Sequence, residues 1–391
     1  MFLEVDLDYP EETHKLHKDF PLAPERYNVT SNELSPINQF LYNKMKNGNQ
    51  QSTYCEEKLI PTFHKRKRYI LHIKCLLFYL SHGLILEKVH RIVSFNQKPF
   101  LKDYTLTLTR LRSIAAGKNL TFFVNVFKLL TNSTYGKFAQ NPNNFTFAKL
   151  CLCEKDLKKA VNCKRFLRAC IVNKNVTIDE YKPEEISYDS PFSVAASILD
   201  LAKLHLYRHY YDVLKPAFVP DEIELLMTDT DSLIFSVNCE NFFDKYKKLP
   251  LFDLSNFQKN DVLYSDKNRK ALLFFKDENP SDFIKKFIGL RSKLYVIKTV
   301  SNQIDKKCKG YNRRFKDTLL TYEKYKHCHR NLNLCRLPLV TIRGFDHHLY
   351  TVLQNKVVLN NFDSKMYICD CNIHTFFYGS KDLNSVCKKC N

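Results

Sequence analysis

The segment IELLMTDTDSLIFSV, residues 223–237, places a short acidic turn between two apolar runs. Two apolar runs that flank a polar turn predict a β-hairpin. Asp229 and Asp231 stand two positions apart at this turn, and side chains at that spacing in a strand point to the same face. Because carboxylates are the ligands that Mg²⁺ prefers, the pair is a candidate metal site. A solvated turn is the alternative, and it is the commoner setting for an isolated D-x-D.

A second pattern, KLLTNSTYG, occupies residues 128–136. Lys128, Asn132 and Tyr135 lie at positions i, i+4 and i+7, so a helix would align them on one face. That face would offer a cation for triphosphate oxygens, an amide, and a ring to lie beneath a nucleotide sugar. Gly136 is expected to end the helix. An amphipathic helix with a polar stripe remains the alternative.

A third pattern is the K-x-Y of residues 293–295, within GLRSKLY. We expect a strand over 290–298, on which Lys293 and Tyr295 face the same side. They would present a cation and a polar ring to a phosphate backbone. A K-x-Y on a surface strand is common, so this pattern alone does not define a site.

The composition indicates a folded protein with a polyanionic partner. Hydrophobic residues make up 44% of the 391 residues and aromatic residues 13%, which is typical of a folded chain. The 61 Lys and Arg exceed the 41 Asp and Glu by 20 charges, which favours nucleic acid because each neutralised phosphate releases a counterion. A basic surface without a partner, or one attracted to an anionic membrane, is the alternative. Neither G-x-G-x-x-G nor G-x-x-x-x-G-K-[ST] occurs, which argues against Rossmann and P-loop enzymes.

The sequence predicts an intracellular protein, with nucleus and cytoplasm both open. The N-terminus lacks the basic and then apolar pattern of a secretory signal. The most apolar stretch, residues 69–86, carries His72, Lys74 and His82 and is too polar to span a bilayer. The 14 cysteines are therefore expected to be reduced thiols.

A zinc site near the C-terminus is a further candidate. Cysteine pairs of the C-x-C and C-x-x-C type, with a histidine between them, could supply four ligands, and reduced thiols are the alternative. The residues concerned are Cys369, Cys371, His374, Cys387 and Cys390.

Local patterns predict the order of helices and strands. Residues 1–68 are rich in proline and charge and are expected to be extended or irregular. Residues 145–190 alternate short apolar runs with charge clusters and favour strands and loops. Asn119 is the expected N-cap of one helix, and another is expected to end before Pro216. The predicted helices cover residues 69–81, 101–115, 119–134 and 193–213.

Together, the three patterns resemble one family. In this order and at these separations, K-x-x-x-N-S-x-Y-G, D-T-D-S and K-x-Y resemble motif B, motif C and the KxY motif of family B DNA polymerases. Further stretches resemble the protein-primed polymerases of Maverick/Polinton-type mobile elements and related viruses: residues 3–10, 21–25, 287–295 and 355–379. The resemblance covers nearly the whole chain and corresponds to the C-terminal polymerase part of those proteins.

This resemblance implies an α/β fold: a family B polymerase palm with helical fingers and a partial thumb, in a right-hand architecture that lacks the exonuclease domain. It assigns residues 1–100 to the N-terminal part of the palm and an insertion region. A fingers hairpin with motif B would occupy 101–140. The palm with motif C and KxY would occupy 141–300, and a thumb-like region would occupy 301–391.

The resemblance also implies roles for the residues of the three patterns. Lys128 would contact the incoming triphosphate, and Asn132 and Tyr135 would line the nucleotide pocket. Asp229 and Asp231 would hold Mg²⁺, or Mn²⁺, in a two-metal site. The primer end and its phosphates would be held by Ser232, Lys293 and Tyr295. The partners would be a DNA template-primer and dNTPs. Priming by a terminal-protein hydroxyl and by a nucleic-acid 3′ end both remain open.

Two departures from the family pattern bear on activity. Met227 stands where the family usually has Tyr, two residues before the first Asp of motif C. Asp6-Leu7-Asp8-Tyr9-Pro10 partly matches motif A, D-x-x-S-L-Y-P, but Glu4 stands five residues before Tyr9. We therefore expect motif A, with its catalytic carboxylate, to be absent, and activity of the chain alone to be reduced or lost. The alternative function is that of a catalytically dead relic that only binds nucleic acid.

Overall fold

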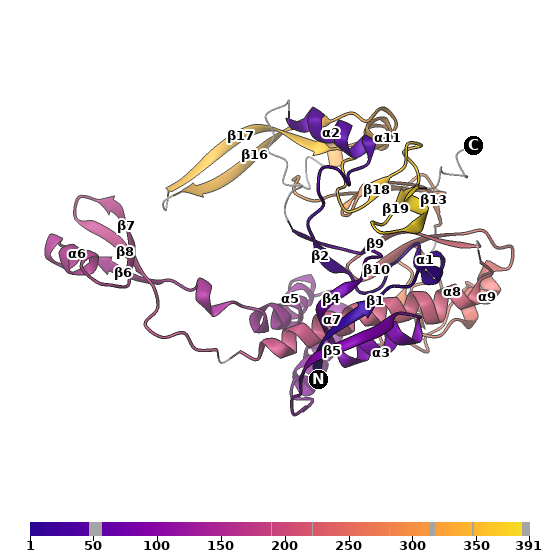
Figure 1. Ribbon diagram of the computed structural model, residues 1–391, viewed down its shortest axis with the longest axis horizontal. Coiled ribbons are helices and arrows are strands. Elements are labelled where there is room, and N and C mark those ends of the chain that lie inside the picture. The colour runs from indigo at the N-terminus through magenta and orange to yellow at the C-terminus, as the bar shows by residue number, and fades with distance from the viewer. Residues whose placement is uncertain are drawn as a thin grey trace. The chain divides into compact units, whose positions relative to one another are not determined.

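The chain forms two compact units, which are described separately. A computed structural model describes residues 1–46, 57–188, 190–220, 222–280, 282–312, 317–345 and 348–384. Unit 1 combines Met1–Ser94, Leu201–Val340 and Leu353–Asn391, whereas unit 2 combines Phe95–Asp200 and Thr341–Val352 (Figure 1). No helix among the described residues is long and apolar enough to cross a membrane.

A three-stranded antiparallel sheet with the order β4-β1-β5 forms the N-terminal part of unit 1 (Figure 1). Its strands are β1 (Phe2–Asp8), β4 (Arg66–His72) and β5 (Ile85–Val93), and α3 (Ile73–Ser81) joins β4 to β5. The helix predicted over 69–81 is thus wrong for its first four residues, which lie in β4. The His72 side chain accepts a hydrogen bond from the Lys74 backbone N–H, and this cap fixes the start of α3 after the strand.

Alternate residues of β1 face the main core. Leu3, Val5 and Leu7 are buried and belong to one apolar cluster with residues of the segment that follows α7 (Phe192–Arg208). That segment is a π-helical turn, His209–Leu214, and it leads into the short α8 (Lys215–Ala217). The helical course therefore continues through Pro216, whereas the sequence pattern predicted an end before it. Proline is tolerated there because it stands in the first turn of α8.

The other face of β1 carries three carboxylates that are all paired with cations. Glu4 contacts Arg68 and Arg91, each at 2.9 Å. Asp6 accepts the Arg68 backbone N–H at 2.8 Å and lies 2.9 Å from His90 Nε2, and these contacts lower its pKa to about 2. Asp8 lies 3.2 Å from Lys65. The segment that partly matches motif A therefore uses its acids to hold neighbouring strands together.

The first 68 residues are more regular than predicted, since they contain two helices and two further short strands. These are α1 (Glu11–His17), β2 (Glu25–Tyr27), α2 (Pro36–Lys46) and β3 (Lys58–Ile60). The remaining elements of unit 1 include α9 (Phe242–Lys248), β11 (Phe252–Asp253), β12 (Phe275–Lys276), β15 (Ile304–Cys308), α11 (Tyr322–Asn331), β18 (Tyr367–Ile368) and β19 (Thr375–Phe376). A long hairpin pairs β16 (Cys335–Phe345) with β17 (His348–Leu359).

Unit 2 contains the helical hairpin that the sequence predicted. Its helices are α4 (Lys102–Gly117) and α5 (Thr121–Phe138). Two details differ: the N-cap of α5 is Leu120, while Asn119 is in the left-handed region with φ +56°, and α5 continues two residues beyond Gly136. Unit 2 also contains a three-stranded sheet with the order β6-β8-β7, in the range where the sequence predicted strands and loops, and one helix that it did not predict. These elements are β6 (Phe147–Cys151), α6 (Glu154–Val161), β7 (Phe166–Asn173) and β8 (Val176–Tyr181).

Two buried histidines of unit 1 limit its stability in acid. His17 is fully buried, and its Nδ1 lies 2.8 Å from the Tyr9 hydroxyl. His209 is 1% exposed, and its ring stacks on Phe275 with the ring centroids 3.7 Å apart. Burial lowers the pKa of His17 to about 3 and that of His209 to about 4, from the ordinary 6.5.

The free energy of unfolding is expected to fall as the pH decreases from 6.5 toward 4, because the unfolded chain binds protons in this range that the folded chain does not. Above pH 6.5 both histidines are neutral in the folded and the unfolded chain, so their burial no longer lowers the free energy of unfolding. His209→Phe retains an aromatic ring against Phe275 and removes one of the two proton sites. The variant should therefore regain up to about 3 kcal/mol at pH 4 relative to the parent. Urea unfolding at neutral pH and at pH 4 measures this difference, and parallel pH curves for the two proteins would contradict the assignment.

Candidate active site

The acidic turn lies at the tip of the predicted hairpin. Strands β9 (Ile223–Asp229) and β10 (Ser232–Val237) are antiparallel, and Asp229 pairs with Ser232, so Thr230 and Asp231 form the turn. The turn is tight: the Asp231 backbone N–H and the Ser232 hydroxyl both donate to the Asp229 carbonyl, at 2.8 and 3.1 Å. Thr230 has φ +63°, a conformation that is costly for a β-branched residue. Such strain is typical of positions where side-chain placement matters.

The hairpin is anchored by its apolar residues. Leu225 on β9 and Leu233, Phe235 and Val237 on β10 pack against the main core of unit 1. The two apolar runs therefore form the two strands of the predicted hairpin, and the polar turn between them lies at the surface. Thr230 and Asp231 are exposed, whereas the Asp229 side chain is 20% exposed.

A second hairpin places Lys293 beside Asp229. It pairs β13 (Ile284–Arg291) with β14 (Leu294–Thr299), and Ser292 and Lys293 form its turn. The strand predicted over 290–298 is therefore wrong at Lys293, which has φ +60°. The Lys293 Nζ lies 3.0 Å from Asp229 Oδ1 and 3.3 Å from Thr230 Oγ1. The D-T-D-S and K-x-Y patterns thus meet at their two turns.

A close approach between the two hairpins depends on Gly289. A Cβ added at this position would stand 2.9 Å from Met227 Cε on β9 and 2.9 Å from carbons of the Phe287 ring. A Cβ does not stand so close to other atoms, so any other residue at position 289 would require the Met227 and Phe287 side chains to shift. Met227, which departs from the family pattern, fills this space with a flexible thioether side chain.

Tyr295 lies on β14 opposite Gly289 and is buried, with 5% of its surface exposed. Its ring centroid is 5.9 Å from that of Phe287. Burial, together with the negative charge of the nearby Asp229, raises the pKa of its hydroxyl to about 12. The hydroxyl is therefore protonated at neutral pH and can act as a hydrogen-bond donor beside the Asp229 carboxylate. The sequence pattern allowed an exposed surface strand at this position, but the Tyr295 ring is buried.

The two carboxylates are candidate ligands for a magnesium ion that brings further ligands with it. Among the described residues no group of three or more His, Cys, Asp or Glu side chains could hold a metal ion. Mg²⁺, however, is commonly held by one or two carboxylates together with water and substrate phosphates. Asp231 is exposed at the tip, and Asp229 is paired with Lys293. The hairpin therefore suits a metal that binds with a phosphate-bearing substrate rather than a closed protein cage.

The candidate nucleotide residues belong to unit 2. Lys128, Asn132 and Tyr135 all lie on α5, where their spacing places them on one face. Lys128 and Asn132 are exposed and Tyr135 is half-buried. The polar side chains between them do not disrupt the helix because they bond back to it: the hydroxyls of Ser133 and Thr134 both donate to the Leu130 carbonyl, at 3.0 Å.

The sequence pattern missed two residues of the site, Thr230 and Gly289. Thr230 was treated as a spacer between the acids, but its hydroxyl accepts from Lys293. Gly289 has no left-handed φ to mark it, and its requirement comes from Met227, which is distant in sequence. Gly289 lies in the stretch 287–295 that resembles the polymerases, but that resemblance assigned it no role.

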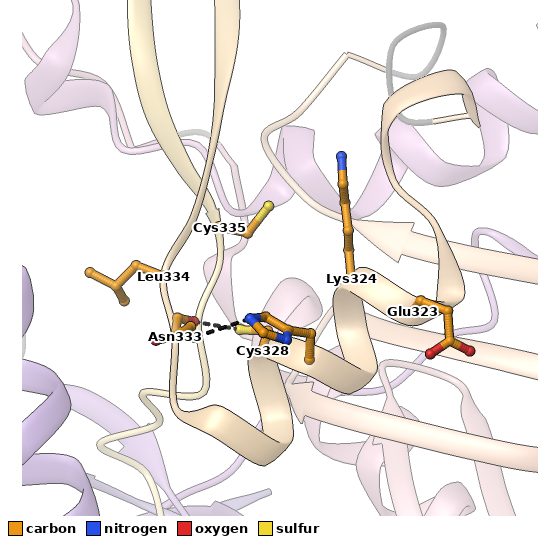
Figure 2. Close-up of a pocket in the computed structure, with 7 residues that line it drawn as sticks. Glu323, Lys324, Cys328, Asn333, Leu334 and Cys335 are labelled. Carbon is orange, nitrogen blue, oxygen red and sulfur yellow. Dashed lines mark hydrogen bonds between the residues drawn. The ribbon is translucent and has the colours of Figure 1, made fainter.

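A pocket of about 500 Å³ elsewhere in unit 1 does not offer comparable chemistry (Figure 2). It is lined by α11 and the start of β16, and it includes Cys328 and Cys335. Burial raises the pKa of both thiols, that of Cys328 to about 12, so neither is a reactive thiolate at neutral pH. The Cys328 thiol instead donates to the Asn333 carbonyl at 2.8 Å.

Comparison with known proteins supports a polymerase. Residues 24–213 match the model of a family described as DNA polymerase type B, organellar and viral. The matched range, a little under half of the chain, includes α4 and α5 and ends before β9. Over this range, the match supports a relationship to type B DNA polymerases. No curated protein and no solved structure matches the chain.

Gly289→Ala is expected to lower the free energy of unfolding by about 1–3 kcal/mol, because the added methyl must displace the Met227 and Phe287 side chains. Urea unfolding measures the change. Gly117→Ala is the matched control, since a Cβ there meets no heavy atom within 4 Å, and it should be neutral or slightly stabilising. Met227→Ala should relieve part of the clash, so additive costs in the double variant would contradict the proposed contact.

Proposed function

We propose that this chain is the polymerase part of a protein-primed family B DNA polymerase, which adds deoxynucleotides to a 3′-hydroxyl on a DNA template by two-metal nucleotidyl transfer. The observation that carries the proposal is the ion pair between Lys293 and Asp229, because it brings the candidate motif C and KxY motif to one place. The family match supports the polymerase class independently, since residues 24–213 include neither motif.

Asp229 and Asp231 are the proposed metal ligands. Bound there, Mg²⁺ or Mn²⁺ would stabilise negative charge on the attacking 3′-oxygen and on the leaving pyrophosphate. The tight turn fixes the backbone between the two acids, so their carboxylates need little reorganisation. Lys293 holds the Asp229 carboxylate in place through its ion pair.

Lys293, Tyr295 and Ser232 are proposed to hold the primer end. Lys293 is 43% exposed, so its ammonium group can exchange the Asp229 carboxylate for a primer phosphate without a change of fold. The protonated Tyr295 hydroxyl can donate a hydrogen bond but cannot add negative charge beside the metal site. The Ser232 hydroxyl donates to the Asp229 carbonyl, so its contribution is to fix the turn that carries the acids.

Lys128, Asn132 and Tyr135 are proposed to bind the incoming nucleotide. The exposed Lys128 suits the triphosphate oxygens, and the half-buried Tyr135 ring suits the sugar. Their helix α5 lies in the range that matches the polymerase family, which supports the assignment.

A catalytically inactive protein that only binds nucleic acid is the second candidate. The net charge of +20 supports binding in either case. The carboxylates of β1 are all paired with basic side chains, so the proposal places the metal on Asp229 and Asp231 at the hairpin. Both candidates would act inside the cell.

Primer extension tests the first candidate directly. On the first candidate, the purified chain with Mg²⁺, a primed DNA template and dNTPs extends the primer, at a rate reduced by the missing motif A carboxylate. Asp229→Ala or Asp231→Ala should each reduce that rate by about a hundredfold or more, since a metal ligand contributes several kcal/mol. Asp244→Ala, in the exposed first turn of α9, is the control and should extend normally. If the parent fails to extend but binds DNA in a salt-sensitive way, the second candidate is favoured; extension by both Asp variants would refute the metal site.

Lys128→Ala is expected to raise the KM for dNTPs about tenfold or more, because it removes a charge-assisted contact to the triphosphate. Lys137→Ala is the matched control: it lies on the opposite face of α5, where its Nζ donates to Gln140 at 3.0 Å. Steady-state incorporation of a single nucleotide separates the two. An equal rise of KM in both variants would show that the general charge of the helix, rather than this face, binds the nucleotide.

A further inference from the structure

The zinc site predicted near the C-terminus cannot be completed among the described residues. Cys371 Sγ lies 3.4 Å from His374 Nδ1 in the turn between β18 and β19, but Cys387 and Cys390 lie outside the described residues. At the tip of the β9–β10 hairpin, by contrast, both candidate metal ligands are described, and so is a cation that contacts one of them.

The Oδ1 atom of Asp229 contacts two polar side chains. Lys293 Nζ lies 3.0 Å from it, and the Thr230 hydroxyl donates to it at 3.2 Å. Lys293 also donates to the Thr230 hydroxyl oxygen at 3.3 Å, so the three groups contact one another pairwise. The ammonium group therefore occupies the space beside the oxygen that Asp229 would offer to a metal ion.

A divalent ion and the Lys293 ammonium group compete for this oxygen. Mg²⁺ binds carboxylate oxygens at about 2.1 Å and requires a nearly ideal octahedral shell of ligands. Two cations on one oxygen would stand about 4 Å apart, where like charges repel strongly near a protein surface. Lys293 must therefore leave Oδ1 when a metal ion binds there, and its charge then needs another anionic partner.

The Lys293 side chain can change its partner while the backbone stays in place. The Lys293 carbonyl accepts from the Lys309 backbone N–H at 3.2 Å, and β13 and β14 pair on both sides of the turn. The close approach of Gly289 to Met227 also fixes the two hairpins relative to each other. The side chain itself is partly exposed and carries its charge on a flexible four-carbon stem. Exchange therefore requires only a rotation of this side chain.

We propose that Lys293 competes with the metal ion for Asp229 and that a phosphate of the primer strand relieves the competition. This inference rests on the proposed function, which assigns the primer phosphates to Lys293. Without a primer, the ammonium group pairs with Asp229 and lowers the affinity of the hairpin for divalent ions. With a primer, it pairs with a phosphate, and both Asp229 and Asp231 can bind the metal. Primer and metal then each increase the affinity for the other by the same factor.

Metal affinity measured without any reaction tests the competition. Mn²⁺ binding to the full chain without DNA, followed by the electron paramagnetic resonance of the free ion, should be about fivefold tighter for Lys293→Met than for the parent. This factor corresponds to the 1 kcal/mol or so that a partly exposed ion pair contributes. Lys293→Arg retains the cation and should bind Mn²⁺ like the parent. Lys286→Met, at an exposed position of β13, removes the same charge and is the matched control.

A primer-template measures the coupling. The primer ends in a 3′-deoxy sugar, so no nucleotide can be added to it. This DNA should tighten Mn²⁺ binding by the parent about fivefold and should have little effect on Lys293→Met, whose competing cation is already absent. Asp229→Asn/Asp231→Asn with the same DNA gives the Mn²⁺ that the DNA binds by itself. The template strand without a primer shows whether any strand phosphate relieves the competition.

Three results would each overturn the proposal. They are a Lys293→Met variant that binds Mn²⁺ no more tightly than Lys286→Met, a primer effect of equal size in the parent and in Lys293→Met, and an equal effect of the unprimed template. Retention of Mn²⁺ by Asp229→Asn/Asp231→Asn without DNA would instead refute the metal site of the proposed function, and this inference with it. The failure of the inference alone is thus distinguishable from the failure of the proposed function.

Discussion

The contact between Met227 and Gly289 is the constraint on which the candidate active site depends. Met227 precedes Asp229 by two residues, and Gly289 precedes Lys293 by four, so their contact fixes the separation of the two turns. The ion pair between Lys293 and Asp229 could not do this alone, because partly exposed pairs contribute only about 0–1 kcal/mol. Apolar packing sets the position of the hairpins, and the ion pair forms because the packing has already brought the charges together.

The parts of the site that could be predicted from the sequence are those with local signals. The β9–β10 hairpin follows from two apolar runs around a polar turn, and α5 follows from helical spacing over KLLTNSTYG. The turn at Lys293 carries no such signal. Leu290 and Leu294, on either side of the turn, are both buried, so the apolar pattern of the strands continues through it. The left-handed residue of the turn is Lys293 rather than the Gly or Asn that usually marks such a position.

Other differences have equally local causes. Gly136 would end α5 only in a left-handed conformation, and it does not adopt one, so the helix continues to Phe138. Pro36 begins α2, as proline often does at the first position of a helix. The high content of proline and charge in residues 1–68 instead predicted an extended or irregular segment. The contacts of Gly289 and the partners of the β1 acids join residues far apart in sequence, and one sequence contains no pattern that predicts them.

The electrostatics of unit 1 determine how a polymerase reaction could use this hairpin. Asp6 has a pKa of about 2 because it is held by Arg68 and His90, so moving its carboxylate to a metal ion would leave these groups without their partner. Under the proposed function, the charge of the metal is then balanced by Asp229, Asp231 and the substrate. A triphosphate would supply its share of that balance only when it is bound. The proposal therefore implies that divalent-ion affinity at this hairpin and nucleotide affinity are coupled, so that each ligand increases the affinity for the other by the same factor.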